Sequence, residues 1–312
     1  MRTRTAKRAV DGVLLLDKPE GASSNRALQI ARRLYGAAKA GHTGTLDPRA
    51  TGLLVALFGE STKFAGALLG ADKSYEATVR LGVTTSTGDA EGEVLAVCDP
   101  EVSLAAVEQA LGSFVGEIEQ VPPLYSALKK DGKPYYEYAR SGKSVERRPR
   151  KVVIHRLGVR SFDGRVIRLE AQVGTGTYLR TLAEDLGAHL GCGAHLAALR
   201  RTRVGPFRLA EAFSLAELEA MKPDGLIGAL RSIDELLGDL PRIDLDAPAA
   251  RCFAHGQPVD IPAAVARGNV RVYGPGQSFL GRGRAEEATL HPDRLLATAA
   301  GGKQPDAPCG TS

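Results

Sequence analysis

Apolar residues fall into short runs along the chain, and the spacing within each run predicts an element of secondary structure. The continuous run Val13 to Leu16 ends at Asp17-Lys18-Pro19-Glu20-Gly21, which predicts a buried strand followed by a turn. Residues 75–81 alternate between polar and apolar, as a half-buried strand does. Further runs that predict strands are 52–58, 152–157 and 166–173, the last two flanking a turn at Asp163-Gly164.

Three segments have apolar residues at helical spacing instead. They are 24–34, which Ser24 is expected to cap, 104–111, and 178–190. The third is the clearest, because its leucines recur at i, i+3, i+4 and i+7 and form one apolar stripe. Tyr178 and Arg180 lie at opposite edges of that stripe, near the helix start. Both side chains are therefore expected to reach from the edge of the core into a cleft.

The order of these elements predicts an α/β protein of the α+β type. Strands outnumber helices without strict alternation, so we expect a mixed, largely antiparallel sheet flanked by helices. The predicted domains are 1–241, with an insertion at about 124–150 that lacks a clean period, and 242–300, whose short strands and Gly or Pro turns predict a small β-barrel. Residues 301–312 are rich in Gly, Pro and polar residues and are predicted to be disordered.

Composition indicates a globular protein with a polyanionic partner. The 312 residues are 43% hydrophobic and 25% charged, with a net charge of +5. Residues 129–156 hold ten Lys or Arg against three acids, so this segment carries +7 and the remainder −2. Four of the eight tyrosines lie nearby (Tyr125, Tyr135, Tyr136 and Tyr138). Cations for phosphates and flat rings for bases are what an exposed RNA strand requires, although a charge run can also be a solvated face.

Other features exclude several classes of protein. No apolar segment is long enough to span a bilayer or to serve as a secretion signal, so we expect a cytoplasmic protein without a membrane partner. Cys192 and His195 form half of a possible metal-binding pair, but no second pair exists, so no metal site is expected. No cofactor-binding motif is present either.

The segment Gly41-His42-Thr43-Gly44-Thr45-Leu46-Asp47-Pro48-Arg49-Ala50-Thr51-Gly52-Leu53-Leu54 holds one acid among glycines, threonines and a proline. Pro48 pushes Asp47 toward an extended backbone, so no helix runs through the segment. One interpretation is an ordinary surface loop. The other is a buried carboxylate beside Arg49 and His42, whose charge its surroundings can tune.

This segment resembles the catalytic-aspartate motif of the bacterial tRNA pseudouridine synthase B family. Further segments resemble other motifs of the same family, in order over roughly residues 11–207: 17–24, 73–75 with 81–93, 122–142, 176–182 and 199–202. Residues 256–259 and 270–281 resemble, more loosely, the PUA domain that ends many such enzymes. The resemblance implies that the 242–300 barrel is PUA-like and binds RNA through residues such as Arg271, Arg282 and Arg284.

The implied activity is isomerisation of a uridine to pseudouridine, at position 55 in the T-loop of tRNA, by an enzyme that flips the base out of its loop. Asp47 is the implied catalytic acid, serving as nucleophile or as partner of an oxocarbenium ion. Arg180 is expected to hold Asp47 ionised through two parallel hydrogen bonds. The reaction needs no cofactor or metal, and the expected partner is the tRNA T-arm, bound by a monomer without an obligate protein partner.

The resemblance also implies residues that contact the substrate. Tyr75 is expected to stack on the flipped base as a catalytic and substrate-binding residue, Tyr178 and Leu199 to wall its pocket, and His42 to contact the substrate. Lys18 is expected to support the active-site loop or bind a phosphate.

Two alternatives remain open at this stage. One is a non-catalytic RNA-binding or RNA-chaperone protein of the same fold, and the other is a guide-RNA-dependent relative. The presence of Asp47, Tyr75 and Arg180 favours an enzyme, and the basic insertion favours one that grips the T-arm without a guide RNA. Whether the reaction passes through a covalent adduct or a glycal is left open.

Overall fold

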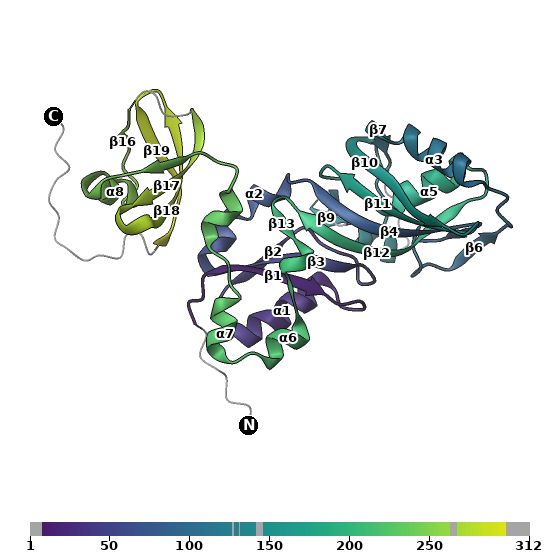
Figure 1. Cartoon of the computed structure of the whole chain (residues 1–312), viewed down its shortest axis with the longest axis horizontal. Helices are drawn as coiled ribbons and strands as arrows, with labels where there is room; N and C mark the ends of the chain where they lie inside the picture. Colours follow the sequence, from purple (N-terminus) through teal and green to yellow (C-terminus); the bar gives the residue numbers. More distant parts are fainter. Residues whose placement is uncertain (1–7, 127, 131, 142–145, 263–266, 298–312) are drawn as a thin grey trace.

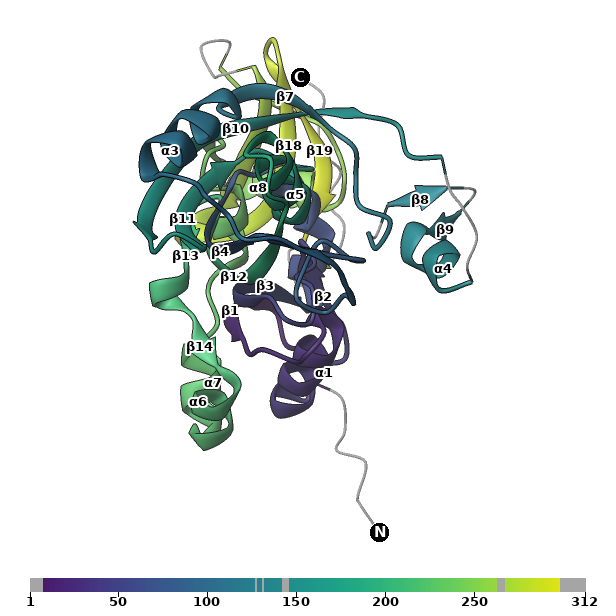
Figure 2. The ribbon, with the colours of Figure 1, turned by 90° about the vertical axis from the view of Figure 1, so that its right-hand side faces the viewer.

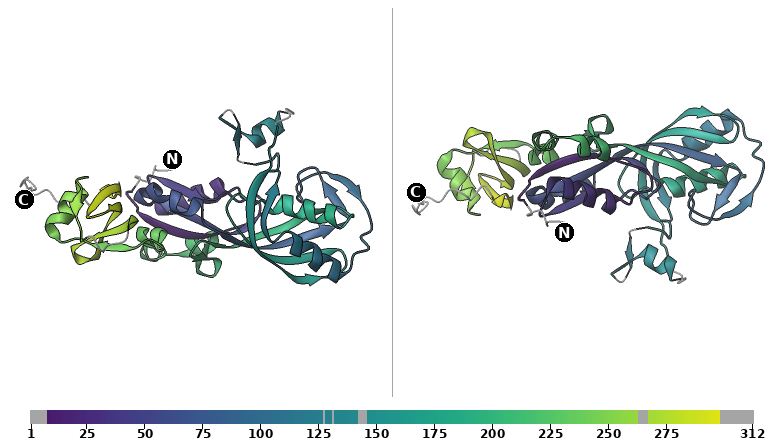
Figure 3. Two further views of the ribbon diagram at one scale, coloured as in Figure 1. Left: turned by 90° about the horizontal axis from the view of Figure 1, so that it is seen from above. Right: turned by 90° about the horizontal axis from the view of Figure 1, so that it is seen from below.

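The computed structural model describes residues 8–126, 128–130, 132–141, 146–262 and 267–297, and the predicted tail at 301–312 lies outside them. The molecule is elongated, with a smaller C-terminal sheet at one end (Figures 1 and 3). The strands of the large sheet are β1 (Gly12–Lys18), β2 (Ala40–Thr43), β3 (Thr51–Phe58), β4 (Lys73–Leu81), β7 (Gly116–Gln120), β10 (Arg150–Phe162), β11 (Val166–Val173), β12 (Ala194–Val204), β13 (Phe207–Arg208) and β14 (Phe213–Ser214).

The helices between and after these strands cover both halves of the sheet. They are α1 (Ser24–Tyr35), η1 (Gly59–Phe64), α2 (Gly66–Leu69), α3 (Leu104–Ser113), α5 (Leu179–His189), η2 (Leu209–Glu211), α6 (Leu215–Ala220), α7 (Pro223–Gly228) and η3 (Ile233–Leu237). In the part of the chain that the structure describes, no helix is long and apolar enough to cross a membrane.

The strand order confirms the predicted mixed sheet. The order is β14-β1-β3-β12-β4-β11-β10-β7, with parallel pairing between β1 and β14 and between β3 and β12, and antiparallel pairing elsewhere along this path. The turn predicted at Asp163-Gly164 joins β10 to β11. The large sheet is therefore mostly antiparallel, as the sequence predicts.

The two halves of the sheet are covered differently. Strands β1 and β3 are buried on both faces, because α1 and α6 pack on one side and η1, α2 and η3 on the other. Strands β4, β11 and β10 bury one face under α3 and α5. Their opposite face carries exposed charged side chains such as Glu76, Arg80 and Arg168. This difference explains why β1 and β3 are continuously apolar while β4 alternates.

One local prediction needs correction. Ser23, not Ser24, caps α1, because the Ser23 hydroxyl accepts the hydrogen bond from the Arg26 amide. The insertion, whose sequence lacks a clean period, forms a small hairpin of β8 (Lys129–Lys130) and β9 (Lys133–Pro134), followed by α4 (Tyr135–Arg140). Figures 2 and 3 show this unit standing away from the body of the molecule. A second small hairpin pairs β5 (Val83–Thr85) with β6 (Val94–Val97).

The C-terminal β unit is also present as expected. It contains β15 (Arg242–Asp244), α8 (Ala247–Ala254), β16 (Val259–Asp260), β17 (Gly268–Gly274), η4 (Pro275–Gln277), β18 (Ser278–Glu286) and β19 (Thr289–Leu295). Phe279 and Leu296 join the apolar cluster that includes Phe64, and the Tyr273 hydroxyl donates to Asp234 at 2.5 Å. The unit is therefore packed firmly against η1 and η3.

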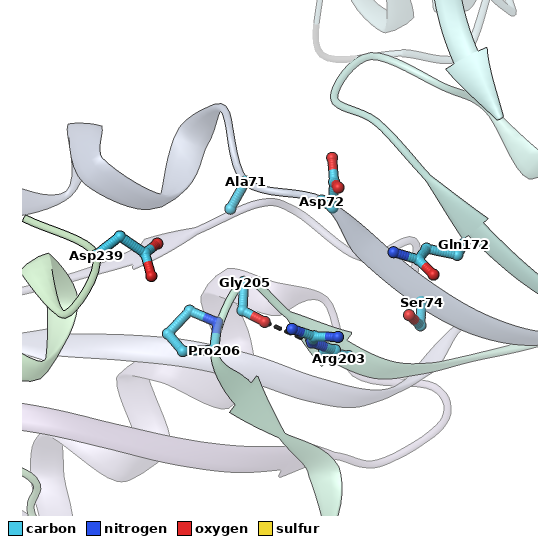
Figure 4. Close-up of a pocket in the computed structure, with 8 residues that line it drawn as sticks. All are labelled: Ala71, Asp72, Ser74, Gln172, Arg203, Gly205, Pro206 and Asp239. Atoms are coloured by element: carbon cyan, nitrogen blue, oxygen red, sulfur yellow. Dashed lines mark hydrogen bonds between the residues drawn. The ribbon is translucent and has the colours of Figure 1, made fainter. Parts of the chain in front are cut away.

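A polar cavity of about 280 Å³ lies where the end of β12 approaches the start of β4 (Figure 4). Its lining includes Asp72, Arg203 and Asp239, and Arg203 donates to the carbonyl of Gly205 at 2.6 Å. None of the residues predicted to act on the substrate lines this cavity. The residues predicted to act on the substrate therefore lie in another part of the molecule.

Candidate active site

The candidate site lies where the large sheet opens between its two halves. Strands β3 and β12 run parallel but share only two residue pairs, Thr51 with Arg200 and Gly52 with Arg201. The backbones approach so closely there that a Cβ on Gly52 would lie 2.3 Å from the Arg201 carbonyl oxygen. Asp47 is in the loop that enters β3 immediately before this contact.

Three buried side chains hold the Asp47 loop. The Lys18 ammonium donates to the carbonyls of Pro19, Ala22 and Pro48, at 2.9, 2.6 and 3.1 Å. On the other side of Asp47, the Ser24 hydroxyl pairs with both the amide and the carbonyl of Leu46.

Arg201 completes this support from β12. Its guanidinium, which is almost fully buried, donates to the carbonyls of Gly44 and Leu53. The backbone on both sides of Asp47 is thus fixed by groups that belong to the folded core.

Arg180 approaches Asp47 from the first turn of α5. Its Nε lies 3.2 Å from Asp47 Oδ2, while its Nη1 donates to the Thr87 carbonyl at 3.4 Å and its Nη2 to the Tyr125 carbonyl at 2.7 Å. The expected pair of parallel hydrogen bonds to Asp47 is not formed, because two of the three guanidinium nitrogens serve backbone carbonyls. Arg180 therefore contacts three segments at once: the Asp47 loop, the backbone at Thr87 and the start of the insertion at Tyr125.

The Asp47–Arg180 pair is buried on one side and open on the other. The Arg180 side chain is 6% exposed, whereas that of Asp47 is 47% exposed. Burial raises the pKa of the Asp47 carboxyl, Arg180 opposes this rise, Asp89 adds to it, and Lys18 opposes it. Arg49 and His42, the neighbours expected from sequence to tune this carboxyl, are not among the groups that shift its pKa.

Asp89 is a second carboxylate at this site, and sequence reasoning assigned it no role. Its Oδ2 lies 3.7 Å from Arg180 Nε, and its Oδ1 accepts hydrogen bonds from the Thr87 hydroxyl and the Glu91 amide. Asp89 lies inside the family-like segment 81–93, but nothing in that pattern indicated that it faces Arg180. Only the fold brings it there.

Three of the predicted substrate-binding residues are Tyr75, Tyr178 and Leu199. Tyr75 on β4 is 8% exposed and packs in the same cluster as Leu46 and Ala50, with the partly buried Leu199 against it. Tyr178 is the N-cap residue of α5. Burial raises the pKa of its hydroxyl, a hydrogen bond with Ser126 and the Arg180 charge oppose this rise, and the Asp47 charge adds to it. Tyr178 is therefore close enough to sense the Asp47 charge, and Tyr75 and Leu199 pack with residues that flank Asp47 in sequence.

His42 and Lys18 are placed differently from these three. His42 lies on β2, and burial together with the nearby Arg201 charge lowers its pKa. Lys18 is fully buried, so its contacts support the first of its two expected roles, holding the loop, and leave no N–H for a phosphate. Burial lowers the pKa of Lys18 to about 8.

A larger cavity, of about 520 Å³, opens next to the Asp47 loop. Its lining contains Arg49 from the loop, Thr51 from the start of β3, Leu199 and Arg200 from β12, and Arg168 from the charged face of β11. Arg200 is paired with Asp17 at 2.7 Å. The lining also includes the acids Glu20 and Glu76, so the cavity presents both signs of charge. Within the described residues, no group of three or more His, Cys, Asp or Glu side chains is arranged to hold a metal ion.

Models of one protein family match most of the chain. Residues 32–179 match the N-terminal domain of the TruB family of pseudouridylate synthases. Residues 180–237 match the tRNA pseudouridylate synthase B C-terminal domain, and residues 241–296 match the C-terminal model of pseudouridine synthase II TruB.

Individual proteins give the same result. The chain is 55% identical over 302 residues to tRNA pseudouridine synthase B of Aromatoleum aromaticum, covering 96% of this chain and 97% of that protein. It is 54% identical over 305 residues to tRNA pseudouridine synthase B of Burkholderia mallei, covering 96% and 98%. Among solved structures it resembles a chain of a Cbf5-Nop10-Gar1 complex, with a TM-score of 0.70, 26% identity, and coverage of 91% and 84%. This chain therefore belongs to the TruB family of pseudouridine synthases.

Proposed function

We propose that this protein converts the uridine at position 55 in the T-loop of tRNA to pseudouridine, and that Asp47 carries the chemistry. Formation of pseudouridine in tRNA, an isomerisation, is the activity of the curated relatives at about 55% identity. The observation that carries the proposed mechanism is the half-exposed Asp47 carboxylate facing the buried guanidinium of Arg180 at 3.2 Å. A carboxylate open to substrate on one side and held by a cation on the other is suited to act at a sugar carbon.

The reaction exchanges one bond of the base for another. The bond between C1′ and N1 breaks, the uracil turns, C5 bonds to C1′, C5 loses its proton and N1 gains one. Asp47 either bonds to C1′ or accepts the proton whose loss gives a glycal, and both routes need the ionised carboxylate. Burial makes that carboxylate more basic, while Arg180 favours its charged form.

The walls of the site support binding of a base that has left its loop. Tyr75, Tyr178 and Leu199 supply the flat and apolar surfaces that a flipped uracil needs. Tyr75 is 8% exposed, so a base that stacks on its ring must displace some of the groups that now cover it. His42 lies on a neighbouring strand and is proposed to contact the RNA rather than Asp47.

A stand-alone tRNA enzyme is favoured over the other two interpretations. The curated relatives are named tRNA pseudouridine synthase B and match at 54–55% identity, whereas the similar chain from a Cbf5-Nop10-Gar1 complex matches at 26%. A non-catalytic protein would have no use for the arrangement of Asp47, Asp89 and Arg180. We also propose that the enzyme works as a monomer in the cytoplasm, which sedimentation with and without tRNA would test.

The direct test is incubation of the purified protein with unmodified tRNA and no other RNA, followed by chemical mapping of pseudouridine. The proposal expects one modified position, 55. Modification only after a guide RNA is added would support the guide-dependent alternative, and tight binding without modification would support the chaperone alternative.

The C-terminal unit is proposed to be PUA-like and to add phosphate contacts away from the chemistry. All three arginines expected to act there have partners: Arg271 donates to the Leu240 carbonyl, Arg282 is paired with Asp293, and Arg284 is paired with Glu286 at 2.7 Å. Arg284 is 65% exposed, so its guanidinium is accessible to a phosphate beside that pair. Arg284→Ala should weaken tRNA binding and lower its salt slope by about 1, with the same uridine modified. An unchanged salt slope would remove Arg284 from the proposed contact.

A further inference from the structure

The base of the insertion is attached to α5 by one buried amide. Gln120 is the last residue of β7, and it is 2% exposed. Its Oε1 accepts the amide hydrogen of Tyr178 at 3.0 Å, and its Nε2 donates to the Tyr178 carbonyl at 3.4 Å. Both ends of one side-chain amide thus bind the backbone of the residue that caps α5.

The next residues continue the attachment. The Thr181 hydroxyl donates to the Val121 carbonyl at 3.5 Å, and Arg180 donates to the Tyr125 carbonyl at 2.7 Å. The first turn of α5 therefore holds the chain at the point where it leaves the sheet to form the insertion. One of these contacts is made by the same guanidinium that faces Asp47.

We propose that Gln120 is a positioning residue for Arg180. Gln120 fixes the start of the insertion relative to α5, and this keeps the Arg180 guanidinium directed at Asp47. This inference rests on the function proposed above. The direction of the Arg180 guanidinium depends on where the Tyr125 carbonyl lies, and Tyr125 is only five residues beyond Gln120. A small shift between β7 and α5 would move that carbonyl and turn Nε away from the carboxylate.

The two-point contact requires a glutamine. An asparagine side chain would be one methylene too short to reach both groups, so Gln120→Asn is not a conservative change at this site. Gln120→Glu would keep the acceptor for the Tyr178 amide but lose the donor to the Tyr178 carbonyl. Gln120→Met would keep the volume and lose both hydrogen bonds.

The test compares these variants with a control on the same strand. Ile118 packs against the core two residues earlier, so Ile118→Ala should destabilise β7 while leaving both hydrogen bonds from Gln120 to Tyr178 in place. For each variant we would measure the single-turnover rate of pseudouridine formation, the affinity for tRNA and the urea midpoint. Gln120→Met is expected to lower the rate about 10- to 100-fold, with affinity within about twofold of wild type. Ile118→Ala is expected to lose stability but keep its rate.

A double-mutant cycle shows whether Gln120 acts through Arg180. The rate losses of Gln120→Met and Arg180→Lys should overlap strongly, so that the double variant is little slower than Arg180→Lys alone. The inference would be overturned if the fold-loss in rate of the double variant equalled the product of the two single fold-losses. A Gln120→Met rate equal to that of wild type would overturn it too. If Gln120→Met does not fold, Gln120→Glu and Thr181→Val are subjected to the same cycle. A wild-type protein that forms no pseudouridine would contradict the proposed function instead.

Discussion

The two sides of the active site are held in different ways. The Asp47 loop is fixed by Lys18, Ser24 and Arg201, whose polar atoms are buried and bind backbone groups of the loop or its flanks. Arg180 is fixed by backbone carbonyls of Thr87 and Tyr125. Tyr125 belongs to the insertion, which stands away from the body (Figure 2). The carboxylate is thus held by the core, whereas one of the two carbonyls that hold the guanidinium belongs to the insertion.

This difference assigns separate tasks to the two sides. A carboxylate that must attack or remove a proton needs a fixed position before substrate arrives. A cation that has one partner in the insertion, the Tyr125 carbonyl, can be adjusted if the insertion contacts RNA. Variants on the Asp47 side should therefore report on chemistry and stability, and variants on the Arg180 side on the coupling of chemistry to RNA binding.

The largest effect is expected from Asp47→Asn. The change removes the charge and keeps the shape, so turnover should fall by at least about 1,000-fold while tRNA affinity stays within about twofold. The pKa of Asp47 is raised in the folded protein, so ionising this group costs stability at neutral pH. The urea midpoint of Asp47→Asn should consequently equal or exceed that of wild type. Measurable turnover above background would remove Asp47 from the chemistry.

A smaller loss is expected from Arg180→Lys. Lysine keeps the charge but cannot serve Asp47 and two carbonyls in the directions of a guanidinium, so the rate should fall about 100-fold. Affinity for tRNA should change little, because Arg180 is buried and not available to phosphates. Single-turnover kinetics with a binding curve would separate the two quantities, and equal losses in both would indicate a plain phosphate contact.

On the other side, Lys18→Met should act mainly on the loop. Three carbonyls lose their donor, so we expect a loss of about 3 kcal/mol in unfolding free energy and a rate about 10-fold lower. Lys222→Met, at an exposed lysine, is the matched control. Because the pKa of Lys18 is about 8, the wild-type rate should decline as pH rises through 8, when a neutral amine can no longer serve three carbonyls. Persistence of that decline in Lys18→Met would assign it to another group.

The smallest effect is a shift in pH dependence. Turnover needs ionised Asp47, so the rate falls as pH falls through its pKa, which burial raises above the ordinary value and Asp89 raises further. Asp89→Asn removes the charge that raises the pKa of Asp47 further. The fall in rate on the acid side should therefore move to lower pH. A move to higher pH would mean that Asp89 acts chiefly by orienting Arg180.

The sequence predicted the fold well where periodicity and burial agree. The continuous run in β1 and the alternation in β4 correspond to strands covered on two faces and on one. The motif around Asp47 and the edge position of Arg180 on α5 pointed to two residues that the fold brings together.

Contacts that join distant segments could not be predicted. The partners of Asp89, Gln120 and Arg201 lie between 58 and 157 positions away in the sequence. No local pattern shows which polar side chain will face which distant group. Ser24 illustrates the limit. It occurs where a helix cap is expected, but its hydroxyl binds Leu46, 22 residues later, and Ser23 forms the cap.

Amide hydrogen exchange with and without tRNA tests the difference between the two sides most directly. The account predicts that the amides of Leu46 and Ala50 exchange slowly in the free protein and change little when tRNA binds, because both are already hydrogen-bonded. The amides of Val121, Leu124 and Tyr125 should exchange faster in the free protein and slow on binding. Fast exchange in the Asp47 loop that tRNA suppresses, with no change at Val121, Leu124 and Tyr125, would contradict the difference between the two sides.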